Sequence, residues 1–115
     1  MLETHREIVW FKSAAKEFQT FPQTAQDKIL DALIVAAQGE TPGLSKPFKG
    51  VGGGVFEIAL KYRKDAYRTV YALQIDDDIW VIHAFKKKSK TGIKTPKQDV
   101  DLIKARIKFL KEKKQ

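Results

Sequence analysis

The stretch that most limits how this chain can fold is residues 79–90, which read Ile-Trp-Val-Ile-His-Ala-Phe-Lys-Lys-Lys-Ser-Lys. Most of its first seven residues are β-branched or aromatic, a composition typical of a buried strand. Four lysines follow within five residues, so this strand would carry several cations and His83 to one edge of a sheet. A core strand that ends in this way predicts a binding site for a polyanion.

The positive charge of the chain is concentrated in the same region. The 115 residues carry a net charge of +8. Residues 83–115 contain 12 Lys and Arg against 3 Asp and Glu, whereas residues 1–82 contain 10 against 11. Because the excess begins at the end of a strand, it favours a localised anionic partner, either nucleic acid or an acidic protein. A basic tail that only aids solubility is the alternative.

Hydrophobic periodicity and turn residues predict a single α+β domain over residues 1–115. The expected helices are residues 14–19 with Ser13 as the cap, residues 22–38, and a C-terminal helix that opens at Thr95-Pro96. The expected strands are residues 6–11, 55–63, 67–73 and 79–85. Short connections make the last three strands an antiparallel meander, which the pair of N-terminal helices would cover. Residues 40–54 are expected to form a loop.

Composition excludes several other classes of protein. A chain without cysteine has neither disulfides nor thiolate metal sites, which fits a reducing cytosol. No apolar run approaches the roughly 18 residues of a membrane span, and the first residues lack the hydrophobic core of a signal peptide. We expect a cytoplasmic protein that needs no cofactor, no metal and no membrane.

Five short segments, taken in order, carry a resemblance to a known family. They are Val-Phe-Glu-Ile at 55–58, Tyr-Arg-Thr-Val-Tyr-Ala at 67–72, Val-Ile-His-Ala-Phe-Lys-Lys-Lys-Ser at 81–89, Thr-Pro at 95–96 and Ala-Arg at 105–106. With the order of elements, they resemble the RelE/HigB/ParE superfamily of toxins from type II toxin–antitoxin systems, and most closely its phage-derived HigB-like branch. The resemblance implies a RelE-like fold: an N-terminal strand and an α-hairpin packed on a small antiparallel meander, with a C-terminal helix.

The resemblance also implies a function. Relatives of the RelE and HigB kind cut messenger RNA on the ribosome without a metal, through attack of the ribose 2′-OH on the adjacent phosphate. This reaction needs cations where negative charge develops and groups that accept and donate protons. The implied partners are mRNA, the ribosome with its rRNA, and a cognate antitoxin of the helix-turn-helix kind.

Four residues match the catalytic positions that the resemblance implies. Arg68 matches the arginine that clamps the scissile phosphate, and Lys61 matches a lysine proposed to assist proton transfer or charge stabilisation. Lys87 stands where relatives usually have arginine, so it keeps the charge without the bidentate fork. His83 is a candidate acid or base. The cations expected to bind RNA are Lys86, Lys88, Lys90 and Lys94.

Three of these residues also have a structural interpretation. His83 shares a strand face with Ile79, Val81 and Phe85 by simple alternation, as a core histidine would. Arg68 can pair with Glu57 across the sheet, and Lys61 can be an ordinary solvated lysine.

Two other functions stay open. Relatives carry a C-terminal catalytic tyrosine, and no tyrosine follows Lys87 in this chain. That feature favours a ParE-like toxin that poisons DNA gyrase without cutting RNA. The third possibility is a degenerate phage protein that only binds nucleic acid.

Overall fold

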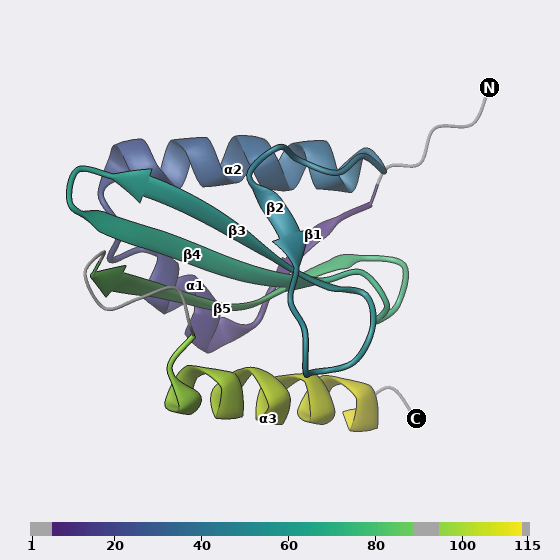
Figure 1. The fold of residues 1–115 in the computed structure, drawn as a ribbon. Helices are drawn as coiled ribbons and strands as arrows, with labels where there is room; N and C mark the ends of the chain where they lie inside the picture. Colours follow the sequence, from purple (N-terminus) through teal and green to yellow (C-terminus); the bar gives the residue numbers. More distant parts are fainter. Residues whose placement is uncertain (1–5, 89–94, 114–115) are drawn as a thin grey trace.

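A computed structural model describes residues 6–88 and 95–113 as three layers (Figure 1). Helices α1 (Lys12–Phe18) and α2 (Gln23–Ala37) cover one face of a central sheet. Helix α3 (Lys97–Lys113) covers the other face. None of the helices within the described residues is long and apolar enough to cross a membrane.

The sheet has five strands in the order β1-β5-β4-β3-β2. These strands are β1 (Ile8–Trp10), β2 (Ser45–Pro47), β3 (Val55–Tyr62), β4 (Asp65–Ala72) and β5 (Ile79–Lys88). The meander β3-β4-β5 is antiparallel, as predicted. The N-terminal strand β1 joins it as a parallel neighbour of β5. The predicted α+β class and its order of helices are confirmed.

Strand β2 lies within the predicted loop. It pairs antiparallel with β3, and the Ser45 and Tyr71 hydroxyl groups lie 2.9 Å apart. Three residues are too few to show an alternating pattern, and Pro47 argues against a strand in the sequence. An edge strand tolerates proline because one side of its backbone needs no ladder partner.

The predicted Ser13 cap is wrong, because α1 begins at Lys12, two residues earlier than predicted. The Phe11 amide donates to the Val81 carbonyl, so sheet bonding continues to Phe11, and this residue occupies the cap position. Pro22 likewise occupies the cap position of α2 and not its first turn. Sequence pattern alone could not fix the exact first residue of either helix.

Strand β5 is buried on both faces, which explains its nearly continuous apolar sequence. Beneath α1 and α2, Ile79 and Val81 pack with Ile29 and Leu33. Beneath α3, Ile82 packs with apolar residues of β4 and of the helix, namely Val70, Ile103, Ile107 and Leu110. The core is therefore two clusters separated by the sheet.

A β-bulge in β5 changes which face His83 occupies. Val70 pairs with His83, but its neighbour Tyr71 pairs with Val81, so Ile82 is an extra residue. Alternation shifts by one residue at a bulge. The expected common face of His83 with Ile79 and Val81 is therefore wrong, since those two pack under α1 and α2. His83 does lie beside Phe85, with ring centroids 5.3 Å apart.

We predict that Ile103→Ala lowers the free energy of unfolding by about 2–4 kcal/mol, because it opens a cavity in the cluster that anchors α3. Ile103 is fully buried, whereas Leu102 beside it is 41% exposed. Leu102→Ala is the matched control and should cost about 0.5 kcal/mol or less. Urea unfolding followed by circular dichroism measures both variants. Equal losses would contradict this packing of α3.

Candidate active site

A basic cleft of about 750 Å³ lies between the β2–β3–β4 end of the sheet and the first half of α3. One wall contains the segment 46–49, and the other contains residues 95–104 of the helix and its start. Five cationic side chains line the cleft: Lys46, Lys49, Arg68, Lys97 and Lys104. Two acidic residues, Glu57 and Asp101, line it as well. The excess of positive charge suits an anionic ligand.

The buried pair of Arg68 and Glu57 faces this cleft. Arg68 Nη1 donates to Glu57 Oε2 at 2.7 Å, and the two side chains are 9% and 4% exposed. The pairing that was one interpretation of Arg68 is therefore present. Arg68 Nε is also buried and has no hydrogen-bond partner among the described residues. A buried donor without a partner costs about 1–3 kcal/mol, so a ligand oxygen that accepted from it would be favoured.

Lys87 and Lys61 lie on the same sheet face as Arg68. Lys61, Ala66 and Lys87 are opposite one another across β3, β4 and β5, one row beyond the row that contains Arg68. Lys87 is 6% exposed, whereas Lys61 is exposed. Burial, followed by the charge of Arg68, lowers the pKa of Lys87 against the opposing effect of Glu57. His83, in the row of Glu57 and Val70, is on this face as well, so the structure brings all four predicted catalytic side chains to one face of the sheet.

The predicted lysine cluster is divided between two faces. Strand β5 was expected to end at Phe85 but continues to Lys88, so its side chains still alternate. Lys86 is opposite Tyr67 and pairs with Asp65 at 3.7 Å, on the face away from Lys87. Lys90 and Lys94 lie outside the described residues. The RNA-binding roles of Lys86, Lys88, Lys90 and Lys94 stay predictions.

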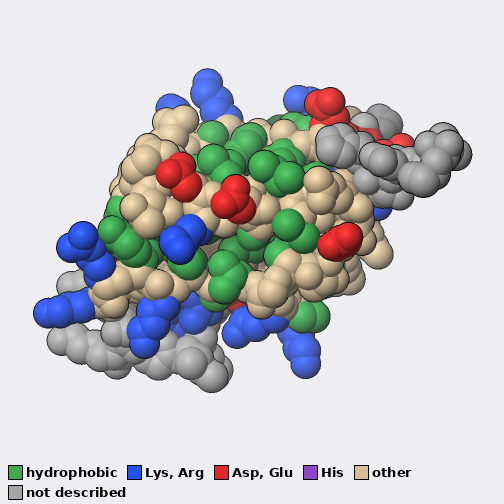
Figure 2. Space-filling model, turned by 90° about the horizontal axis from the view of Figure 1, so that it is seen from above, with side chains coloured by type: hydrophobic (Ala, Val, Ile, Leu, Met, Phe, Trp, Pro, Cys, Tyr) green, Lys and Arg blue, Asp and Glu red, His purple; other side chains and the backbone are tan. Residues whose placement is uncertain are grey.

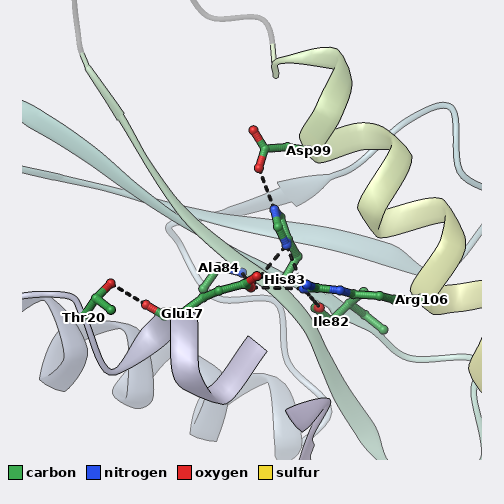
Figure 3. A network of polar contacts seen from close by, with 7 residues as sticks. All are labelled: Glu17, Thr20, Ile82, His83, Ala84, Asp99 and Arg106. Atoms are coloured by element: carbon green, nitrogen blue, oxygen red, sulfur yellow. Dashed lines mark hydrogen bonds and ion pairs between the residues drawn. The ribbon is translucent and has the colours of Figure 1, made fainter. Parts of the chain in front are cut away.

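His83 lies inside a polar network that joins three elements (Figure 3). Its Nε2 is 2.7 Å from Asp99 Oδ1, on the first turn of α3. Its Nδ1 is 2.9 Å from Arg106 Nη1 and 3.2 Å from Glu17 Oε1. The ring is 2% exposed and does not line the cleft. This geometry favours the structural interpretation of His83 over an acid or base.

Arg106 is the centre of this network and was not identified as a site residue from the sequence. Its two terminal nitrogens donate to the two carboxylate oxygens of Glu17 at 3.0 and 2.9 Å, and Nη1 also donates to the Ile82 carbonyl at 3.0 Å. The Ala84 amide donates to Glu17 as well. An arginine beside the apolar stripe of a predicted helix was the available signal, but its partner is 89 residues away.

This network contains two carboxylates, Glu17 and Asp99, and one imidazole, His83, but these three side chains do not form a metal site. Over residues 6–88 and 95–113, no group of three or more histidine or acidic side chains is arranged to hold a metal ion.

A comparison of the sequence with family models matches residues 16–108 to "Phage derived protein Gp49-like". The chain belongs to the Gp49-like family. The match includes every cationic residue of the cleft described above and the whole network around Arg106. No curated protein matches the chain.

Solved structures place this Gp49-like chain in the RelE fold. A mutant of the Escherichia coli toxin RelE in the free state is similar at a TM-score of 0.60 and 16% identity, over 91% of this chain and 97% of that one. The toxin–antitoxin complex RelBE2 of Mycobacterium tuberculosis is similar at 0.51 and 16% identity, over 73% and 93%. The predicted fold family is confirmed.

We predict that Glu17 stabilises the Gp49-like chain at neutral pH but not in strong acid. Burial opposes its ionisation, yet hydrogen bonds from His83, Arg106 and Ala84 lower its pKa from 4.5 to about 2. A depressed pKa adds stability that is present above pH 4.5 and is lost as the pH falls through about 2. Partial exposure reduces this contribution to about 1–2 kcal/mol.

Glu17→Gln should therefore be less stable than the parent at pH 7, and the difference should shrink between about pH 4.5 and pH 2. Urea unfolding across this range measures it. Glu40→Gln removes one exposed carboxylate and controls for the loss of a charge. A difference between Glu17→Gln and the parent that stays constant with pH would contradict the network.

Proposed function

We propose that this chain is the toxin of a type II toxin–antitoxin pair and an endoribonuclease that cuts mRNA on the ribosome. The observation that carries the proposal is Arg68: it lines a cleft rich in lysines with a buried Nε that has no partner among the described residues. Both structural relatives above are toxins, one of them in complex with its antitoxin. The proposed partner that neutralises this toxin is a cognate antitoxin of the helix-turn-helix kind.

The cleft suits a phosphodiester. A guanidinium binds phosphate oxygens through a planar fork of donors, and only one Arg68 donor is held by Glu57 in the contacts above. Lys46 and Lys49 on one wall face Lys97 and Lys104 on the other. These exposed cations would hold the flanking phosphates, so binding should weaken as salt rises.

The proposed reaction forms a bond from the ribose 2′ oxygen to phosphorus and breaks the bond from phosphorus to the 5′ oxygen. Arg68 stabilises the charge that develops on the phosphate. Glu57, released in part when Arg68 turns to the phosphate, accepts the proton of the 2′-OH. Lys87 donates a proton to the leaving 5′ oxygen, because its lowered pKa makes the ammonium a stronger acid than an exposed lysine. Lys61, at the exposed end of the row formed by Lys61, Ala66 and Lys87, binds the RNA.

We predict that Arg68→Ala lowers mRNA cleavage by about 100-fold or more, since removal of one transition-state donor costs about that much. The wild-type chain and the variant are expressed under tight control, and the 5′ ends of cellular mRNAs are mapped within minutes. New cuts in frame within translated codons should appear for the wild-type chain only. Arg63→Ala changes an exposed arginine at the β3–β4 turn and should cleave normally.

Arg68→Ala leaves Glu57 buried without its partner, which can unfold the chain. Arg68→Lys keeps the charge and loses only the fork, so it should fold and cleave less than the wild-type chain. If folded variants at Arg68 cut as well as the wild-type chain, the proposal fails. Growth arrest with intact mRNA would support the gyrase-poisoning alternative, and normal growth would support a binding protein.

We predict that Lys87→Arg slows cleavage and removes its alkaline limb. With lysine, the rate should fall as the pH rises through the lowered pKa, because the neutral amine has no proton to donate. Arginine stays protonated in proteins, so its variant should show a lower rate without this fall. Cleavage in a purified translation system, followed from neutral pH into the alkaline range, measures both. Parallel profiles would remove Lys87 from proton transfer.

A further inference from the structure

A second hollow of about 420 Å³ lies beside the second half of α3. The turn at Gly50 and Val51 forms one side, and the helix forms the other with Ile107, Lys108 and Lys111. The reaction proposed above uses none of these residues. Lys104 lines both this hollow and the active-site cleft, so the two are neighbours along the same helix.

Four lysines form one stripe on α3. Lys97, Lys104, Lys108 and Lys111 follow one another at intervals of seven, four and three residues, and these intervals return to the same face of a helix. At a rise of 1.5 Å per residue, the stripe is about 21 Å long. It begins in the cleft and ends in the second hollow. A row of cations of this length matches the repeated charges of a polynucleotide backbone.

We propose that the second hollow binds the sugar–phosphate backbone of single-stranded RNA, as the continuation of a strand whose scissile phosphate lies on Arg68. This inference rests on the proposed function of the cleft. Lys108 and Lys111 neutralise phosphates, and the apolar floor made by Ile107 and Val51 accepts a ribose or base face.

The charge distribution favours RNA over an acidic protein segment. From Lys104, which lines the cleft, the lysines continue along α3 at intervals of four and three residues, and the cleft contains a buried arginine donor that has no partner among the described residues. Of the two acidic residues along this helix face, Asp101 is already paired with Lys97 at 3.0 Å, and Glu112 stands at the far end. Figure 2 shows that, on the face seen from above, acidic side chains lie among apolar ones and most cations lie toward the margin.

The test compares two labelled RNAs, about 4 and about 12 nucleotides long, whose 2′-OH at the cutting position is replaced by hydrogen. Fluorescence anisotropy measures their affinity for the full chain at several salt concentrations. The variant Lys108→Ala/Lys111→Ala is compared with Lys12→Ala/Lys16→Ala, which removes the same charge from exposed lysines of α1. Lys104 is left unchanged because it belongs to both cavities.

The α3 variant should bind the longer RNA about tenfold more weakly, and its salt slope should fall by about 1.4 for two lost phosphate contacts. Its affinity for the short RNA, and both affinities of the α1 variant, should change less than about twofold. Equal losses in the two variants, or an equal loss with the short RNA, would overturn the inference.

Cleavage separates this inference from the proposed function. If no cut appears in cells but the longer RNA still depends on Lys108 and Lys111, the hollow binds RNA and the nuclease proposal fails. If cells show cuts and the α3 variant binds both RNAs normally, the inference alone fails. An acidic peptide that binds through these lysines while RNA does not would also overturn it.

Discussion

The bidentate pair between Arg106 and Glu17 is the contact on which the arrangement of the three layers depends. It joins α3 to α1 past the edge of β5, and the same guanidinium binds the Ile82 carbonyl at the bulge. Arg106 also lies over the Phe11 ring, 5.1 Å from its centroid. Arg106 is largely buried whereas Glu17 is 29% exposed, so the carboxylate contributes about 1–2 kcal/mol to stability. The position of α3, and with it one wall of the cleft, therefore depends on a charge from the first helix.

The cleft exists because α3 is anchored unevenly. Its fully buried apolar contacts begin at Ile103, whereas its first turn is held by the bond between Asp99 and His83. Residues on both sides of Asp99 line the cleft, so the contact of His83 with Asp99 helps to hold this wall of the cleft in place. The cations gathered there would repel one another, and Glu57 offsets this repulsion at the position where Arg68 and Lys87 are buried.

Local patterns predicted the elements well and predicted their faces less well. The alternation of β3 and β4, the apolar run of β5 and the stripe of Val100, Ile103, Ile107 and Leu110 each depend on neighbours in sequence. The bulge at Ile82 does not, since it is set by register with β4, and it reversed the face expected for His83. Strand β2 was hidden by its length and its proline. Glu17 and Arg106 could not be paired because local rules carry no information across 89 residues.

The absence of a tyrosine after Lys87 has a consequence for the proposed chemistry. In the proposed reaction the proton donor for the leaving oxygen comes from the sheet, where few side chains beside Arg68 face α3. His83 is enclosed by Asp99, Arg106 and Glu17, and Lys61 is solvated at the rim. Lys87 lies one row from Arg68, and burial together with the charge of Arg68 lowers its pKa. In the proposed reaction, burial beside a guanidinium would make Lys87 the acid, in place of the tyrosine that the family resemblance implies.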